Sequence, residues 1–200
     1  MKFTRIFLFL FIFSIFSCSK KYSVLDVPEY KFICDFSEKI KKDFDLTLYC
    51  YGVNIGSKPK NVKFGISNFR ISYYVSKKKG DAVTLEESRN LIIFVVEKLL
   101  SEINYSDVIR DRLDVFPFTS NSIDLMIYFK DENKIDLGNG IATVSLYNEK
   151  IKYEKYDISE YRKTYPCIGK HHVIHQESYE DALQIVKGNN PLTQIEDGKI

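Results

Sequence analysis

The three histidines of this 200-residue chain, His171, His172 and His175, lie within five positions of one another, and Cys167 precedes them by four residues. Imidazole nitrogen and thiolate sulfur are common ligands of zinc and copper. On a helix, His171 and His175 would be neighbours able to bind one ion. On a strand they would stand about 13 Å apart, too far for one ion to reach both. Because Val173-Ile174 favours a strand, we expect neither a metal nor another cofactor here.

The same residues suggest a catalytic arrangement in which a histidine activates the Cys167 thiol. A reactive thiolate needs a neighbouring imidazole or a helix N-terminus to lower its pKa, and the sequence shows neither geometry. The chain also lacks G-x-S-x-G, H-E-x-x-H, P-loop and C-x-x-C motifs, and Gly138-Asn139-Gly140 predicts a turn because no helix follows it. We therefore expect no catalytic residue. A small envelope enzyme or metal-binding protein using Cys167 and the histidines is the alternative hypothesis.

Closely spaced tyrosines in the second half of the chain form the predicted partner surface. They are Tyr147, Tyr153, Tyr156, Tyr161 and Tyr165. A tyrosine can bury its ring and keep its hydroxyl in water, which suits a surface that binds a protein or a glycan. The same property suits the half-buried face of any sheet, and that reading remains the alternative.

The N-terminus has the pattern of an export signal. Lys2 and Arg5 precede an apolar run from Ile6 to Phe16, interrupted only by Ser14. The run is shorter than the roughly twenty residues of a membrane-spanning helix and fits the apolar region of a signal peptide. We expect residues 1–17 to be removed on export.

The tetrapeptide Ile15-Phe16-Ser17-Cys18 resembles the lipobox of bacterial membrane lipoproteins. In that family the cysteine sulfur receives a diacylglyceryl group and the signal is cut just before it. The resemblance therefore implies that Cys18 carries fatty acyl chains, such as palmitate, and anchors the protein in the cell envelope, facing the periplasm or the exterior. Phe16 departs from the family pattern, in which a small residue is usual. Ser17 and Ser19 also fit ordinary signal cleavage, so a plainly secreted soluble protein is the alternative.

Lipidation of Cys18 would leave three thiols, at Cys34, Cys50 and Cys167. An odd number of cysteines cannot all pair within one chain. Cys34 and Cys50 lie on consecutive predicted elements, so an oxidising envelope would permit a disulfide between them. The alternative is that each is a small buried hydrophobic residue.

The charge balance predicts no nucleic-acid partner. Lys2 and Arg5 leave with the signal, which reduces the 29 basic residues to 27 and equals the 27 acidic residues. A neutral exported domain has no electrostatic attraction for phosphate backbones. The expected partners are the membrane, through the lipid anchor, and an envelope protein or glycan.

Hydrophobic periodicity predicts the elements of the first half. Pro28 can open a helix on which Phe32, Phe36, Ile40 and Phe44 recur every four residues. Residues 46–55 and 62–75 then predict two strands. In the second strand the apolar residues change phase, so we expect a bulge at Ser67-Asn68 that keeps Phe64 and Ile66 on the same side as Ile71 and Tyr73.

Two capping boxes predict the later helices. Thr84 and Glu87 start a helix that continues to about Asn104, and Ser178 and Asp181 start a last helix that ends near Gly188. Between them, residues 123–130, 141–147 and 150–156 alternate in polarity as a three-stranded meander. A short strand is expected over 170–175.

These elements predict an α+β fold, an antiparallel sheet of about five to six strands with a C-terminal meander and about three helices packed on one face. Residues 1–17 are the expected signal peptide and 18–27 the lipidated cysteine and tether. Residues 28–188 form a single domain, followed by a flexible tail over 189–200. The function predicted is a membrane-anchored exported lipoprotein acting as a non-enzymatic binding or assembly module of the envelope.

Overall fold

The computed structural model of the protein describes residues 27–56, 65–78, 80–114, 116–131, 133, 140–157 and 170–189. Several predictions fall on residues outside these ranges, namely the signal peptide, Cys18, Phe64, Tyr161, Tyr165, Cys167 and the tail from residue 190.

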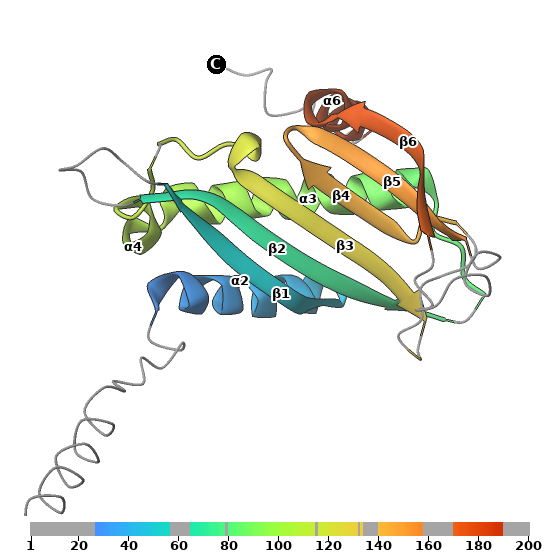
Figure 1. Ribbon diagram of the computed structural model, residues 1–200, viewed down its shortest axis with the longest axis horizontal. Coiled ribbons are helices and arrows are strands. Elements are labelled where there is room, and N and C mark those ends of the chain that lie inside the picture. The colour runs from blue at the N-terminus through green and yellow to red at the C-terminus, as the bar shows by residue number, and fades with distance from the viewer. Residues whose placement is uncertain are drawn as a thin grey trace, which may run out of the picture.

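The chain alternates between helices and a single sheet (Figure 1). The described elements in order are α2 (Pro28–Phe44), β1 (Leu46–Gly56), β2 (Gly65–Lys77), α3 (Leu85–Tyr105), α4 (Asp107–Arg110), the 3-10 turn η2 (Ser120–Ser122), β3 (Ile123–Asp131), β4 (Thr143–Tyr147), β5 (Lys150–Asp157), β6 (Lys170–Ser178) and α6 (Tyr179–Asn189). The six strands lie side by side in the order β1-β2-β3-β4-β5-β6. This arrangement confirms the predicted α+β fold.

One strand pair departs from the antiparallel sheet expected from the sequence. β2 and β3 run parallel, whereas the other four neighbouring pairs are antiparallel. Parallel neighbours need a long connection that returns along the sheet, and α3 is the longest element of that connection. The amphipathic helix that the sequence predicts between the two strands is thus the element that makes them parallel.

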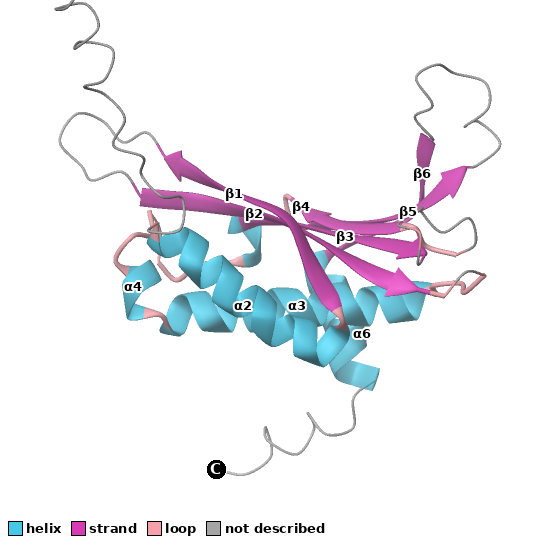
Figure 2. Ribbon diagram, turned by 90° about the horizontal axis from the view of Figure 1, so that it is seen from below, coloured by secondary structure: helices cyan, strands magenta, loops and turns pink. Residues whose placement is uncertain are grey.

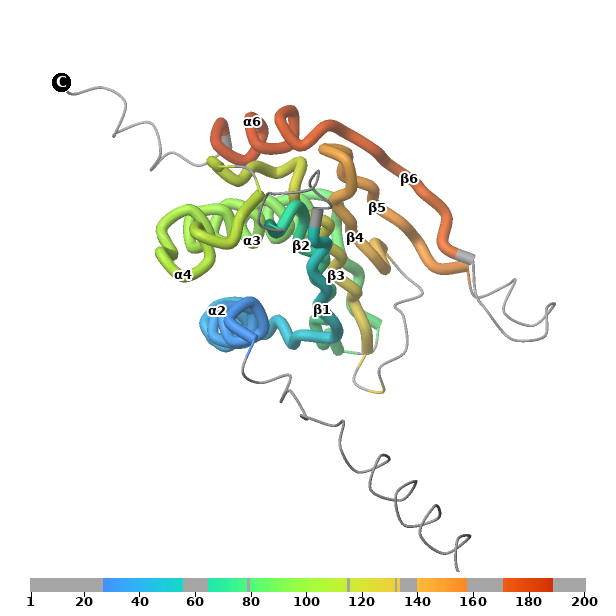
Figure 3. Tube along the Cα trace, turned by 60° about the vertical axis from the view of Figure 1, so that its left-hand side comes forward, coloured from blue at the N-terminus to red at the C-terminus, as the bar shows by residue number. Residues whose placement is uncertain are grey.

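The helices form one layer. Figure 2 shows α2, α3 and α6 on the same face of the sheet, as predicted. In Figure 3 the layer is seen nearly end-on, with α3 between α2 and α6, while the strands follow one another from β1 beside α2 to β6 beside α6. No helix among the described residues lies on the other face, which we term the open face.

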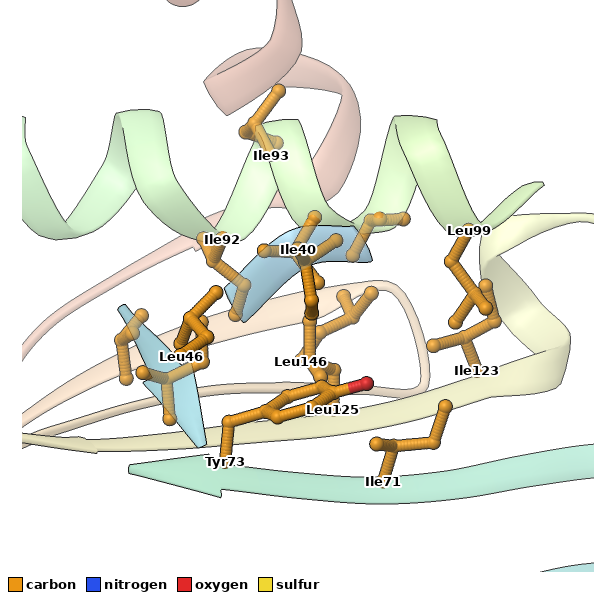
Figure 4. Close-up of a cluster of buried hydrophobic side chains, with 14 of the residues drawn as sticks. Ile40, Leu46, Ile71, Tyr73, Ile92, Ile93, Leu99, Ile123, Leu125 and Leu146 are labelled. Carbon is orange, nitrogen blue, oxygen red and sulfur yellow. The ribbon is translucent and has the colours of Figure 1, made fainter. Parts of the chain in front are cut away.

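Helix α3 supplies the centre of the core. Its N-cap is Thr84, whose side chain accepts a hydrogen bond from the backbone N–H of Glu87 at 3.1 Å, as the predicted cap requires. Ile92 and Leu99 are fully buried and point from α3 toward the strands (Figure 4). They meet apolar side chains of β2, β3 and β4, so this face of the sheet becomes the interior.

The predicted bulge in β2 is present. Asn54 of β1 pairs with Asn68, but the next residue, Ile55, pairs with Ile66, so Ser67 is the extra residue. The Ser67 hydroxyl donates to the Asn54 carbonyl at 3.1 Å. Because of this insertion, the residues on either side of it keep the same orientation, and Ile66 is buried together with Ile71 and Tyr73.

Tyr73 links the sheet to α2. Its side chain is fully buried, and its hydroxyl lies 3.0 Å from the hydroxyl of Ser37. Ser37 donates its own proton to the Ile33 carbonyl at 2.6 Å, so Tyr73 is the donor to Ser37. Burial raises the pKa of Tyr73 above its ordinary value of 10, and the phenol therefore stays protonated.

Gly140 approaches the backbone of Val83 closely. It has a φ of 77°, and an added Cβ would lie 2.5 Å from the backbone N and O of Val83. The neighbouring Ile141 N–H donates to the Val83 carbonyl at 2.9 Å. This bond holds the segment before β4 against Val83, the residue that precedes the Thr84 cap of α3.

We expect Gly140→Ala to lower the free energy of unfolding. A left-handed backbone in a non-glycine residue alone costs about 1–3 kcal/mol, and the collision with Val83 adds to that cost. Urea denaturation measures it. Gly52→Ala is the matched control, since a Cβ at Gly52 would meet nothing within 4 Å. Alanine is favoured over glycine inside a strand, so this variant should be neutral or raise the free energy of unfolding by up to about 1 kcal/mol. Equal losses in both variants would contradict the close approach of Gly140 to Val83.

Candidate functional site

The structure separates the histidines considered as metal ligands. All three lie on β6, where Tyr153 of β5 pairs with His175 but the next residue, Glu154, pairs with Val173. This bulge turns His175 toward the helices, where its ring packs 5.5 Å from that of Tyr153. His171 instead faces the open side. A regular strand would place both on one face, because they are four positions apart, and the bulge is the reason that they are not.

No metal centre is found among the described residues. They contain no group of three or more His, Cys, Asp or Glu side chains that could hold an ion. His172 extends toward Asp157, with 3.9 Å between Nε2 and Oδ2, and therefore joins neither of the other two rings. In the part of the chain that the structure describes, the three imidazoles thus have three different environments.

The cysteines considered for a disulfide lie on opposite sides of the sheet. Cys34 is on α2, and Cys50 is an exposed residue of β1, and both are free thiols in the structure. β1 has its own bulge at Tyr49, because Leu48 pairs with Tyr73 while Cys50 pairs with the preceding residue of β2. Cys50 therefore points to the open face, and the sheet stands between the two sulfur atoms.

The tyrosines predicted as a partner surface also divide between the two faces. Tyr153 is fully buried on the helix side. Tyr147 is exposed and Tyr156 is half-buried, and both lie on the open face. Successive residues of a strand alternate between faces, so residues 153 and 156 of β5 cannot share one.

A buried polar network joins α3 to the edge of the sheet. The Arg89 guanidinium donates to Oε1 of Glu177 at 2.8 Å, and the Tyr153 hydroxyl donates to the same oxygen. The Arg89 and Glu177 side chains are only 12% and 8% exposed. Burial alone would raise the pKa of Glu177, but the hydrogen bonds from Arg89 and Tyr153 outweigh it and lower that pKa. Burial, then the carboxylate of Glu177, raise the pKa of Tyr153.

A second tyrosine–carboxylate pair lies nearby. The hydroxyl of Tyr179, the first residue of α6, donates to Glu97 of α3, and burial together with this bond raises the Tyr179 pKa. In both pairs the phenol stays protonated, and in the network the carboxylate stays ionised at neutral pH. A general acid or base works best with a pKa near the working pH, so these groups hold elements together.

The open face carries a continuous polar and aromatic surface. The register aligns one row of side chains straight across the sheet, namely Thr47, Tyr74, Tyr128, Thr143, Glu154 and Val173. We define the open-face surface as the chemically distinctive members of this row and their neighbours, which are Tyr49, Tyr74, Tyr128, Lys130, Glu154, Tyr156 and His171, together with Thr143, which is only 1% exposed. It draws on all six strands.

One half of the open-face surface is a cation held between aromatic rings. The β1 bulge leaves Tyr49 63% exposed, and its ring stands edge-on to Tyr128 with 6.0 Å between centroids. The Lys130 ammonium lies 5.6 Å from the Tyr49 centroid and 5.4 Å from the Tyr128 centroid. Such contacts hold a lysine in place by attraction to the π faces. The ammonium and the two rings thus form one cluster on the open face.

The other half centres on His171. Its Nδ1 lies 3.3 Å from the Thr143 hydroxyl and 3.7 Å from Oε2 of Glu154, and its ring packs 5.3 Å from that of Tyr156. Thr143 is buried, so Glu154, Tyr156 and His171 are the groups that can exchange hydrogen bonds with, or stack against, a planar or sugar ring. Thr143 and Tyr128 are direct partners across β3 and β4, so the two halves are contiguous.

Sequence reasoning missed most of this surface. Tyr49, Tyr74 and Tyr128 come from the first two-thirds of the chain, and only the register of four strand pairs brings them beside Tyr156. The available signal was one polar or aromatic residue at every second position of each strand. That signal places each residue on a face but does not say which residues on other strands are its neighbours.

The chain matches no protein-family model, no curated protein and no solved structure. Among the described helices, none is both long enough and apolar enough to cross a membrane. The geometry of the open-face surface and the N-terminal sequence pattern are therefore what a functional assignment can draw on.

Glu177→Gln keeps the side-chain size and removes the charge that Arg89 and Tyr153 contact. We expect it to lower the free energy of unfolding by about 1–3 kcal/mol at neutral pH, because Arg89 loses its charged partner in a largely buried site. Folding holds the pKa of Glu177 below its ordinary value of 4.5, so this stabilisation is present above that value. It disappears as the pH falls through the lower folded pKa.

Urea unfolding curves between about pH 7 and pH 3 test this expectation. The difference between wild type and Glu177→Gln should shrink at the acidic end, where the wild-type carboxyl becomes neutral as well. Glu180→Gln, in the exposed first turn of α6, is the control and should have little effect. A difference that stays constant over the whole pH range would contradict the network.

Proposed function

We propose that this protein is a membrane-anchored lipoprotein of the bacterial cell envelope whose domain binds an envelope protein or glycan through the open-face surface. The observation that carries the proposal is the one-sided sheet. Three helices pack on one face, and the strand register places tyrosines, a lysine, a glutamate and a histidine on the other.

The chemistry of the open-face surface favours binding. Tyrosine is among the residues that contribute most to binding energy at interfaces, because a rigid ring adds contact area and its hydroxyl adds a hydrogen bond. Tyr49 and Lys130 add a partly exposed aromatic edge and a positioned cation. A polar polymer lying across the strands could stack on the rings and exchange hydrogen bonds with Glu154 and His171.

The described acid–base groups favour binding over catalysis. Burial, then the hydrogen bond to Glu177, raises the pKa of Tyr153, and the hydrogen bonds from Arg89 and Tyr153 lower the pKa of Glu177 despite its burial, so both pKa values lie away from neutral pH. The alternative of an enzyme or metal-binding protein needs the histidines to act together, and His171 and His175 lie on opposite faces. A binding module needs neither arrangement.

The lipobox-like Cys18 supports the anchor. The apolar run before it is too short to span a bilayer, so lasting attachment would depend on acyl chains, each buried methylene contributing about 0.8 kcal/mol. A single chain gives only marginal attachment, whereas two give a stable one, and the lipobox chemistry installs at least two. Residues 19–27 then separate the acylated cysteine from α2.

Full-length protein produced in a bacterial host with labelled fatty acid tests both parts of the proposal. Wild type should take up the label, fractionate with membranes and, after mild detergent extraction, retain envelope material. Cys18→Ala should lose the label. Tyr49→Ala combined with Tyr128→Ala should keep the label but retain at least about tenfold less envelope material, which is the loss of about 1.4 kcal/mol or more that two interface aromatics give.

The matched control is Phe94→Ala, which removes a 42% exposed aromatic ring from the helix side and should leave retention unchanged. Protease or glycan-hydrolase treatment of the retained material distinguishes a protein from a glycan. Equal retention by wild type and the open-face variant would contradict the binding surface. A soluble wild type without label, beginning near Lys20, would contradict the anchor.

A further inference from the structure

The end of the domain that holds the start of α2 exposes an unusual amount of apolar surface. Tyr105 is 85% exposed, Val108 63%, Ile55 61% and Phe116 56%, and Val27, immediately before α2, is 39% exposed. The first four are four of the five most exposed large apolar side chains in the described part of the chain. Exposed apolar groups are expected singly, but a cluster of them marks a contact surface.

These residues share one end of the molecule although they come from distant parts of the sequence. α4 packs against the C-terminal part of α3 and against α2. Just after α4, the Arg112 carbonyl accepts a hydrogen bond from the Ile66 N–H at 2.7 Å, and Ile66 is the strand partner of Ile55. Figure 1 shows α4, the start of α2 and the adjoining ends of β1 and β2 together at the left.

The tether enters the domain at this same end. Nine residues, 19–27, lie between Cys18 and the first residue of α2. Even a fully extended chain of nine residues spans only about 30 Å. An acylated Cys18 would therefore keep this end close to the bilayer, whereas β6 begins at the opposite end of the sheet.

Three ion pairs join charged groups at this end. Arg112 pairs with Glu29 at 2.5 Å, Arg110 with Asp107 at 2.7 Å, and Lys39 with Glu102 at 2.9 Å. A surface with paired charges and exposed Tyr, Val and Phe has the composition suited to the headgroup region of a membrane, where aromatic rings settle at the interface. Attraction to anionic lipid is not its basis.

We propose that Tyr105, Val108 and Phe116, with Ile55 and Val27, form a membrane-contact surface that inserts shallowly into the lipid headgroup layer. The inference rests on the proposed lipid anchor and adds an orientation to it. This end of the domain faces the bilayer, so the strands extend away from the membrane. The open-face surface then lies roughly perpendicular to the bilayer plane and is accessible to a ligand beside the domain.

The absence of tryptophan from the sequence allows a direct test, because one introduced tryptophan is then the only one. Full-length lipidated Tyr105→Trp and Val108→Trp are placed in phosphatidylcholine vesicles whose acyl chains carry bromine near the headgroups. Bromine quenches tryptophan that enters the interface. Emission should fall at least about twofold relative to unbrominated vesicles and shift to shorter wavelength, with no need for anionic lipid. Val173→Trp, 49% exposed on β6, is the matched control and should be unaffected.

Adding Val108→Asp to the Tyr105→Trp variant should reduce the quenching and leave fatty-acid labelling intact, whereas Val173→Asp in the same background should change neither. Equal quenching at residues 105 and 173 would overturn the membrane-contact surface. So would the absence of quenching at residues 105 and 108 in protein that carries the fatty-acid label. Neither result would contradict the lipid anchor. If the introduced tryptophan of Tyr105→Trp is instead protected from bromine by concentration-dependent self-association, the membrane-contact surface is wrong and this end binds a second molecule of the protein. Loss of fatty-acid label from the wild type would instead overturn the proposed function itself.

Discussion

The structure depends on the burial of α3 against the parallel pair β2 and β3. A chain that leaves β2 can return to start β3 in the same direction only by crossing the sheet, and α3 makes that crossing with Ile92, Val96 and Leu99 fully buried. Once α3 occupies one face, α2 and α6 pack on either side of it, and the whole core forms on that face. The alternation of side chains along each strand then leaves the other row on the open face.

That constraint explains why two groups of polar residues have different roles. Residues that face the helices, such as Glu177 and Tyr153, are buried and must satisfy one another, so they form a network whose pKa shifts favour a fixed charge state. Residues that face the open side, such as Tyr49 and Lys130, pay no such penalty and remain accessible. The same sheet therefore separates residues that stabilise the fold from residues that remain accessible on the open face.

Local patterns in the sequence predicted the fold well. The caps at Thr84 and Ser178 and the bulge at Ser67 were predictable because each depends on residues within a few positions of one another. The site was predicted poorly because it depends on bulges that leave no such pattern. The extra residues at Tyr49 and near Ile174 reverse the faces of Cys50 and His175, and that reversal separates the thiols and the histidines that spacing alone had grouped. Arg89 and Glu177 are 88 positions apart, so their contact had no local signal at all.

Tyrosine modification followed by peptide mass analysis tests the central claim most directly, because the two faces of the sheet carry tyrosines of very different exposure. In purified full-length protein, Tyr49 should react readily, while Tyr73 and Tyr153, both fully buried, should not. In intact envelopes, Tyr49 and Tyr128 should become protected by the bound ligand. Equal reactivity of Tyr49 and Tyr128 in envelopes and in purified protein, or a Tyr153 that reacts as fast as Tyr49, would contradict a one-sided sheet with a binding surface on its open face.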